Sequence, residues 1–290
     1  LRGRRFYAQV RRRGVDLALR MYRRAIDLDP AYALAHAGVA ECSVFLYFNA
    51  DRDEAHRREA LEASAVALEL DPESPEAHTA RGLALSANER PDEAREAFEV
   101  AIRLDPRSFE ARYNYARECF TSGRPDDAIR EYEQAAALRP DDFQGPLLVS
   151  QIYEDLGRPA EAAEARRRGV RAAERRLDLH PDDTRALYMG ANGMVGLGQR
   201  ERGLEWARRA RDLEPDEPML LYNLGCIHAM AGDPAVALDC LEHAITAGFR
   251  HRPWFEQDSN LDAIRDRPEF VALLGRIQGD AAGRPSDDVR

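Results

Sequence analysis

The apolar positions of the chain follow a helical period that proline interrupts at regular intervals. In AIRLDPRSFEARYNYARECF, residues 101–120, a helical pattern runs into Asp105-Pro106 and a second pattern begins within four residues. The residue before a proline is pushed out of helical geometry, so Leu-Asp-Pro is expected to end the first helix. The same interruption recurs along the chain, at Pro30, Pro72, Pro106, Pro140, Pro181 and Pro215.

The spacing of these prolines is nearly constant. Three of the five intervals are 34 residues long, and the other two are 42 and 41 residues long. A fixed period of this length is typical of stacked supersecondary units, in which one helix pair cannot bury its apolar face alone. The prolines therefore predict an array of helix pairs.

Small residues recur in the same frame. Alanine or glycine lies twelve residues before each proline, for example Ala94 and Ala128. Further small residues lie ten residues after each proline and, at every proline but Pro181, five residues before it. Because the side chains at a contact set the helix separation, these positions are expected where two antiparallel helices touch. Glycine is expected to end the first helix of a unit in the left-handed conformation, at Gly123, Gly157, Gly198 and Gly232. The prolines two residues after Gly123, Gly157 and Gly232 suit the first turn of the second helix.

This frame resembles the tetratricopeptide repeat, a helix-turn-helix unit of 34 residues with small residues at positions 8, 20 and 27 and proline at position 32. Residues 75–108 and 109–142 match it without gaps. The resemblance implies an all-α solenoid, a right-handed superhelix of antiparallel helix pairs, over residues 1–249. About seven repeats are expected, at 1–32, 33–74, 75–108, 109–142, 143–183, 184–217 and 218–249.

Two units exceed this length. The eight extra residues LYFNADRD, at 46–53, are expected to lengthen the first helix of their unit or the turn after it. The seven extra residues within 161–181 equal about two helical turns, so the second helix of that unit is expected to reach about twenty residues. Its arginines either dock an acidic partner or form a solvated face with interleaved glutamates: Arg166, Arg167, Arg168, Arg171, Arg175 and Arg176.

The end of the chain departs from the repeat. Residues 250–277 are rich in apolar side chains without the repeat's spacing, and we expect them to cap the last repeat, while residues 278–290 are expected to be disordered. The ending W-x-x-x-D-x-x-L-D-x-I-R-x-x-P-x-F-x-x-L-L is similar to the close of repeat arrays in multidomain bacterial signalling proteins, where an adenylyl cyclase, Ser/Thr kinase or winged-helix domain precedes the array. Leu1 enters in mid-pattern, so we expect the sequence to be part of a longer polypeptide.

Composition restricts the class of partner and the compartment. A net charge of −10 argues against nucleic acid, which calls for a basic face. The longest purely apolar stretch, VFLYF at 44–48, is far shorter than the ~20 residues of a membrane helix, so no membrane partner is expected. Widely spaced cysteines inside helical patterns suit reduced thiols and a cytoplasmic location: Cys42, Cys119, Cys226 and Cys240.

No motif indicates catalysis or a cofactor. All 42 basic residues are arginine, which excludes a Walker phosphate loop, a kinase-type catalytic lysine and a Schiff-base lysine from this segment. The sequence also lacks H-E-x-x-H, G-x-S-x-G and C-x-x-C. Cys226 and His228 lie about 200° apart on a helix, so with Cys240 and His243 at most three ligands reach one metal ion, and packing between helices is favoured. We therefore expect no enzyme, no metal site and no cofactor.

In the family that the repeats resemble, the first helix of each unit lines a concave groove through positions 2, 5, 9, 12 and 13, counted from the first residue of the unit. On this resemblance the candidate partner-binding residues are Tyr113, Arg117, Gln151, Arg185, Tyr188, Asn192 and Tyr222. The three tyrosines occupy position 5, where each either contacts a partner or packs on its neighbour. The lysine-containing clamp by which some members grip a C-terminal carboxylate is not reproduced.

Together these observations indicate a non-catalytic interaction scaffold that holds a protein or peptide segment in its groove, on the units from 109 to 230. The alternative is a regulatory or oligomerising array within a larger signalling enzyme or transcriptional regulator. In that case the partner would be an upstream domain of the same polypeptide.

Overall fold

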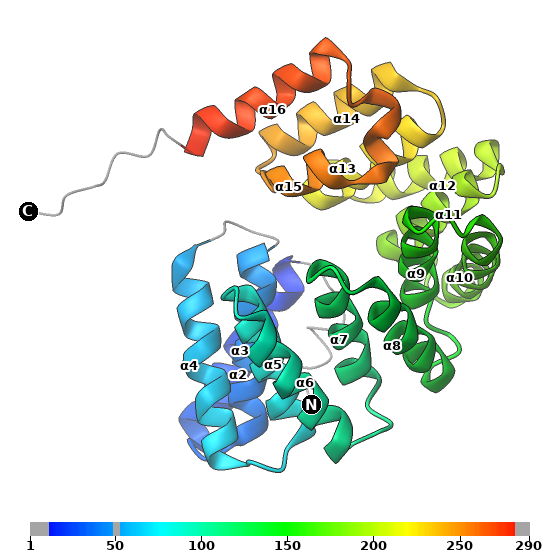
Figure 1. Cartoon of the computed structure of the whole chain (residues 1–290). Coiled ribbons are helices and arrows are strands. Elements are labelled where there is room, and N and C mark those ends of the chain that lie inside the picture. Colours follow the sequence, from blue (N-terminus) through cyan, green and yellow to red (C-terminus); the bar gives the residue numbers. More distant parts are fainter. Residues whose placement is uncertain (1–11, 49–52, 282–290) are drawn as a thin grey trace, which may run out of the picture. The chain divides into compact units, whose positions relative to one another are not determined.

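The computed structural model describes residues 12–48 and 53–281, and over these ranges the chain is helical with no strand (Figure 1). The chain divides into two compact units, Leu1–Pro140 and Asp141–Arg290. In the first unit the helices are α2 (Arg12–Leu28), α3 (Ala33–Leu46), α4 (Glu54–Leu70), α5 (Pro75–Ala87), α6 (Pro91–Leu104), α7 (Phe109–Thr121) and α8 (Pro125–Leu138).

In the second unit the helices are α9 (Gln144–Asp155), α10 (Pro159–Leu179), α11 (Thr184–Gly196), α12 (Arg200–Leu213), α13 (Pro218–Met230), α14 (Pro234–Thr246), α15 (Arg252–Gln257), the 3-10 helix η2 (Ser259–Ile264) and α16 (Pro268–Ala281). Consecutive helices form pairs, α3 with α4, α5 with α6 and α7 with α8 in the first unit, and α9 with α10, α11 with α12 and α13 with α14 in the second. Within each unit the first helix of one pair also packs on the first helix of the next, α3 on α5 and α5 on α7 in the first unit, and α9 on α11 and α11 on α13 in the second.

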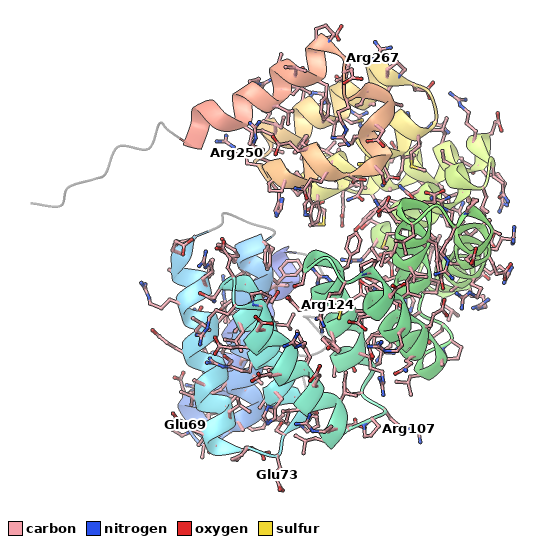
Figure 2. The ribbon with its side chains drawn as sticks, in the orientation of Figure 1. Glu69, Glu73, Arg107, Arg124, Arg250 and Arg267 are labelled. Atoms are coloured by element: carbon pink, nitrogen blue, oxygen red, sulfur yellow. The ribbon has the colours of Figure 1, made fainter. Side chains whose placement is uncertain are left out.

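The turns are as the prolines and glycines predict. α4 ends at Leu70, two residues before Pro72, and α6 ends at Leu104, two residues before Pro106. Charged side chains such as Glu69, Glu73 and Arg107 surround these turns (Figure 2). Gly123 has φ +70°, which confirms the predicted left-handed end of α7.

The unit that lacks this glycine uses a different residue. Glu89, between α5 and α6, adopts φ +59°, a conformation that costs an ordinary side chain more than it costs glycine. The position in the repeat therefore determines the conformation of this turn even where the residue is not glycine.

The small residues lie at the helix contacts. Ala94 of α6 and Ala128 of α8 are fully buried. A Cβ atom added to Gly82 of α5 would lie 2.8 Å from the ring of Phe98 on α6, a separation that Cβ atoms essentially never show from other heavy atoms. These positions agree with the helix contacts that the small residues predict.

The two longer units differ in how they use their extra residues. α10 has 21 residues, as predicted. In the other unit α3 has 14 residues and α4 has 17, against 14 in α6, so part of the extra length extends the second helix rather than the first. Residues 49–52, in the middle of this segment, lie outside the described residues. Tyr47 and Phe48 stay helical after Leu46, so the expectation of a longer first helix or turn remains a prediction, although α4 also begins earlier in its unit than α6 does.

The segment after the last repeat covers repeat 7. Phe255, Leu261, Ile264 and Phe270 are fully buried against Leu241 and its neighbours on α13 and α14. We call residues 252–277 the cap. Helix α16, which begins within the cap, runs to Ala281, so the expectation that residues 278–281 are disordered is wrong. The rest of the expected tail, residues 282–290, lies outside the described part of the chain.

None of the helices within residues 12–48 and 53–281 is both long enough and apolar enough to cross a membrane.

Candidate partner-binding surfaces

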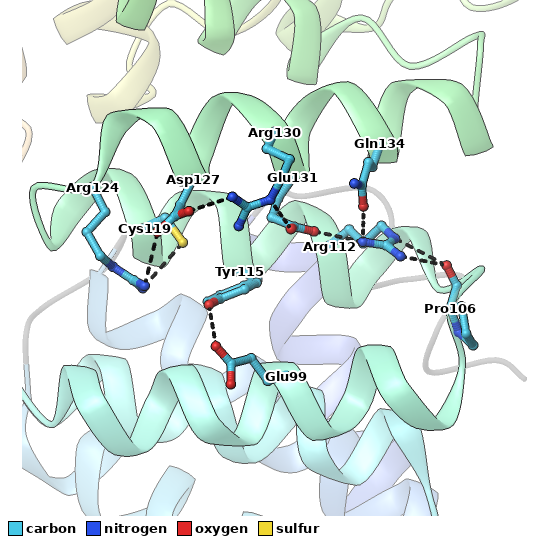
Figure 3. Close-up of polar contacts among 10 residues, drawn as sticks. All are labelled: Glu99, Pro106, Arg112, Tyr115, Cys119, Arg124, Asp127, Arg130, Glu131 and Gln134. Atoms are coloured by element: carbon cyan, nitrogen blue, oxygen red, sulfur yellow. Dashed lines mark hydrogen bonds and ion pairs between the residues drawn. The ribbon is translucent and has the colours of Figure 1, made fainter.

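One face of α7 is fixed to both neighbouring helices by polar contacts (Figure 3). Arg112 donates to Glu131 of α8 at 2.8 Å, and both side chains are mostly buried. On the other side, the Tyr115 hydroxyl donates to Glu99 of α6 at 2.9 Å. Charge-assisted hydrogen bonds of this kind are strong when they are shielded from water. The rotation of α7 about its axis is therefore determined.

A second group of contacts lies at the end of α7 and the start of α8. Arg124, which precedes α8, donates to the Cys119 sulfur at 3.3 Å, and Arg130 donates to Asp127 at 2.6 Å (Figure 3). Burial raises the pKa of the Cys119 thiol to about 11. The thiol is therefore protonated at neutral pH and acts as a packing group rather than a nucleophile.

The opposite face of α7 carries Tyr113, Arg117 and Phe120. At 100° per residue, Arg117 lies about 200° around the helix from Tyr115, so it points away from the fixed face. Arg117 is exposed, and among the residues that the structure describes none forms an ion pair with its guanidinium. Phe120, three residues further on, is 43% exposed.

Tyr113 is held in place by other rings. It stacks on Phe109, with ring centroids 5.6 Å apart, and meets Tyr132 of α8 edge-on at 5.6 Å. Tyr113 is half-buried, so it takes part in packing and still contributes surface beside Arg117. The packing interpretation of a position-5 tyrosine therefore holds for this residue, and its contact with a partner stays a prediction. We call Tyr113, Arg117 and Phe120 the α7 surface.

In the second unit the corresponding positions contact the cap. Three side chains from two helices donate to one carboxylate, that of Asp258: the Gln151 amide at 3.2 Å, the Tyr222 hydroxyl at 2.9 Å and the Cys226 thiol at 3.5 Å. Gln151 is at position 9 of its repeat on α9, and Tyr222 and Cys226 are at positions 5 and 9 on α13. The predicted groove positions of this unit therefore bind a segment of the same chain.

Apolar contacts accompany this carboxylate. The Phe255 ring is fully buried, with its centroid 5.1 Å from that of Tyr222, and Trp254 lies 5.7 Å from the same ring. Burial raises the pKa of the Tyr222 hydroxyl and of the Cys226 thiol, so both remain neutral donors. Tyr222 is only 2% exposed, and the prediction that it is open to a partner is wrong because the cap covers it.

The other predicted residues of the second unit are also partly engaged. Tyr188 is buried in the core between α11 and its neighbours. The Asn192 amide lies 3.4 Å from the Met230 sulfur, and Arg185 is half-buried. The sequence identified Gln151 and Tyr222 as contact positions but did not assign Asp258, their common acceptor. The only sequence signal for it is its place in the W-x-x-x-D ending.

Ion pairs of the exposed arginines of α10 favour the solvated face over the docking patch. Arg167 pairs with Glu164 at 3.0 Å, and Arg176 pairs with Asp183 at 2.8 Å. Arg166 is 4% exposed and pairs with Glu154, so it cannot join a surface patch.

The cysteine and histidine residues of repeat 7 point to different neighbours. The Cys226 thiol faces Asp258, His228 Nδ1 lies 3.6 Å from Asp233, and His243 Nδ1 lies 3.4 Å from Asp239. Within the described residues no group of three or more His, Cys, Asp or Glu side chains is placed to hold a metal ion.

Comparison with family models identifies tetratricopeptide repeats in this chain. The tetratricopeptide-repeat model matches residues 48–109, 79–143 and 116–176. No curated protein sequence matches the chain.

Solved structures share the fold at low identity. A chain from the crystal structure of the APC/C hetero-tetramer Cut9-Hcn1 has a TM-score of 0.63 and 16% identity, and the match covers 94% of this chain and 54% of that one. This chain therefore spans about half the length of that protein. YrrB, a TPR protein with an unusual peptide-binding site, has a TM-score of 0.41 and 19% identity, with 65% and 94% covered. A structure of MamA has a TM-score of 0.40 and 20% identity, with 61% and 94% covered.

The family model and the first of these structures establish the architecture. The chain contains tetratricopeptide repeats, and its fold is that of an all-α tetratricopeptide solenoid.

Proposed function

We propose that this chain is a protein-interaction scaffold that binds a protein or peptide segment on the inner faces of the first helices of its repeats, and that the α7 surface is the open part of that face. The observation that carries the proposal is the binding of the cap. Positions 5 and 9 of α13 already hold a polypeptide segment, through Tyr222 and Cys226. Positions 5 and 9 of α7 are Tyr113 and Arg117.

Exposure supports this assignment. Arg117 is an exposed cation without an ion-pair partner in the described parts of the chain, next to an exposed aromatic ring. Arginine and aromatic side chains are enriched among the residues that contribute most to protein interfaces. The similar solved chain comes from a hetero-tetramer, which is in keeping with an assembly role.

Displacing the cap from its site would cost free energy, because its anchoring side chains are deeply buried. Phe255 and Leu261 are fully buried, and burial of one such side chain stabilises the folded state by about 1.5–3 kcal/mol. A partner that displaced the cap would have to replace these contacts as well as the hydrogen bonds to Asp258. The α7 surface needs no such displacement, so we place the partner there.

The proposal is tested with a double variant of the intact protein, Arg117→Ala with Phe120→Ala. Once a partner has been isolated by pull-down, this variant should bind it at least tenfold more weakly, a loss of about 1.4 kcal/mol or more. The melting temperature should stay unchanged because both side chains are exposed.

The matched control is Arg107→Ala with Leu104→Ala, which removes an arginine and an apolar side chain of similar exposure (41% for Leu104) at the turn before α7. It should bind like the wild type. If the α7 variant binds normally and neutralising Arg167 and Arg171 abolishes binding, α10 is the docking site and the proposal fails.

A further inference from the structure

We infer that the α7 surface selects a segment in which an apolar ring is followed three residues later by a carboxylate, the pattern with which the cap binds α13. This inference rests on the proposed function and adds the chemistry of the partner. It is drawn from a comparison of two helices within this one chain.

The cap shows how a segment binds at positions 5 and 9. Phe255 contributes the ring, with its centroid 5.1 Å from that of Tyr222, and Asp258 contributes the carboxylate. One oxygen of that carboxylate accepts from both the Tyr222 hydroxyl and the Cys226 thiol. On α13, a tyrosine and a second donor four residues after it therefore bind a segment in which an aromatic side chain and a carboxylate lie three residues apart.

The α7 helix repeats this arrangement of donors. α7 and α13 each have 13 residues, and each carries tyrosine at position 5 of its repeat, Tyr113 and Tyr222. Position 9 is Arg117 on α7 where α13 has Cys226. A guanidinium is always charged and can donate two parallel hydrogen bonds to a carboxylate, so it is a stronger acid-binding group than a thiol.

The remaining positions favour a segment that carries its own ring. Position 12 is Phe120 on α7, 43% exposed, where α13 has the buried Ala229. Aromatic pairs stabilise a contact beyond the area that they bury. Phe120 and Tyr113 thus offer aromatic surface on the same side of the helix as Arg117, since they lie three and four residues from it.

Nearby acids do not neutralise Arg117. Glu110, on the same side of α7, is paired with Arg139 at 2.7 Å, and Arg139 also lies 3.7 Å over the ring of Phe109. Glu118 is buried and accepts from the Ser122 hydroxyl at 2.6 Å. The α7 surface therefore presents one cation, which suits a single carboxylate rather than a polyanion.

The experiment uses the intact protein and a synthetic peptide with the sequence of residues 250–266, RHRPWFEQDSNLDAIRD, blocked at both ends and labelled. Fluorescence anisotropy measures its affinity up to millimolar protein. Two peptide variants accompany it, one with Asp258→Asn and one with Phe255→Ala. We expect the unaltered peptide to bind, and each variant peptide to bind at least tenfold more weakly.

The contact between arginine and acid is tested by a double-mutant cycle. Arg117→Ala in the protein should weaken the unaltered peptide at least tenfold. Against the Asp258→Asn peptide it should have less than a threefold effect, because the two groups act as one interaction. The Arg107→Ala, Leu104→Ala protein is the control and should behave like the wild type.

Three results would overturn the inference. The first is no binding of the unaltered peptide, and the second is equal binding of the Asp258→Asn peptide. The third is that Tyr222→Phe in the protein abolishes peptide binding while Arg117→Ala does not, which would mean that the peptide exchanges with the cap. If the isolated partner depends on Arg117 and Phe120 while the peptides do not, the proposed function stands and this selectivity is wrong. If neither depends on them, both fail.

Discussion

At the scale of single residues, Asp258 connects the cap to the repeats. Its carboxylate accepts hydrogen bonds from Gln151 on α9 and Tyr222 on α13, and its backbone oxygen accepts from Arg265 at 2.8 Å. It also begins η2 by accepting from the Asn260 amide at 3.0 Å. A buried donor that loses its acceptor costs about 1–3 kcal/mol.

We therefore predict that Asp258→Ala lowers the free energy of unfolding by about 1–3 kcal/mol, because the buried Tyr222 hydroxyl loses its shorter hydrogen bond and keeps only the 3.2 Å bond to the Trp254 carbonyl oxygen. The control is Asp262→Ala on the same 3-10 helix, where the aspartate pairs with Arg265 at the surface and is worth less than about 1 kcal/mol. Chemical denaturation measures both. Equal stability of the two variants would show that Asp258 does not anchor the cap.

At the scale of helices, the small residues determine how closely a pair can approach. Ala94 on α6 and Ala128 on α8 are fully buried at equivalent places in consecutive repeats. We predict that Ala94→Leu and Ala128→Leu each lower the free energy of unfolding by about 1–3 kcal/mol through overpacking. Ala160→Leu, at an exposed position near the start of α10, should have little effect. The assigned register is wrong if both buried variants melt with the wild type.

The elements could be predicted because their signals are local. A proline ends a helix through its own ring, and Gly123 takes the left-handed conformation more easily than any other residue, so both act whatever surrounds them. The length of α10 could also be predicted, since seven added residues keep the same face of a helix inward. The extension of α4 could not, because either helix or the turn can accept extra residues until neighbours are in place.

The candidate site could be predicted only in part. Repeat position singled out Arg117, which the structure shows to be exposed, and Tyr113, which is half-buried against Tyr132; their contact with a partner stays a prediction. It could not show that Tyr222 is covered, because the cap reaches α13 through contacts between residues 32 and 36 apart in the chain, at Trp254 and Asp258. No periodic pattern in residues 254–264 encodes that path, which depends on the fit of Phe255 and Leu261 in the core.

At the scale of the whole molecule, the cap ends the second unit and covers repeat positions of α9 and α13. We predict that removing residues 250–290 exposes Tyr222, Leu241 and Ile245, which frays repeat 7 or causes aggregation. Hydrogen exchange should then speed up in residues 218–248. Removal of residues 282–290 alone is the control and should leave that exchange unchanged. If the longer truncation leaves it unchanged too, the cap is an independent appendage.

Equivalent repeat positions on α7 and α13 therefore have different contacts within one chain. On α13 the face is used by the chain itself, and on α7 the equivalent positions carry an exposed arginine and an exposed phenylalanine. The central claim is that the α7 surface binds the partner.

Hydrogen exchange of the intact chain, with and without its isolated partner, tests that claim most directly. The account predicts that partner binding slows exchange in residues 109–121, while residues 218–230 keep the exchange that the cap already gives them. Slower exchange in 218–230 or in 159–179, with 109–121 unchanged, would contradict it.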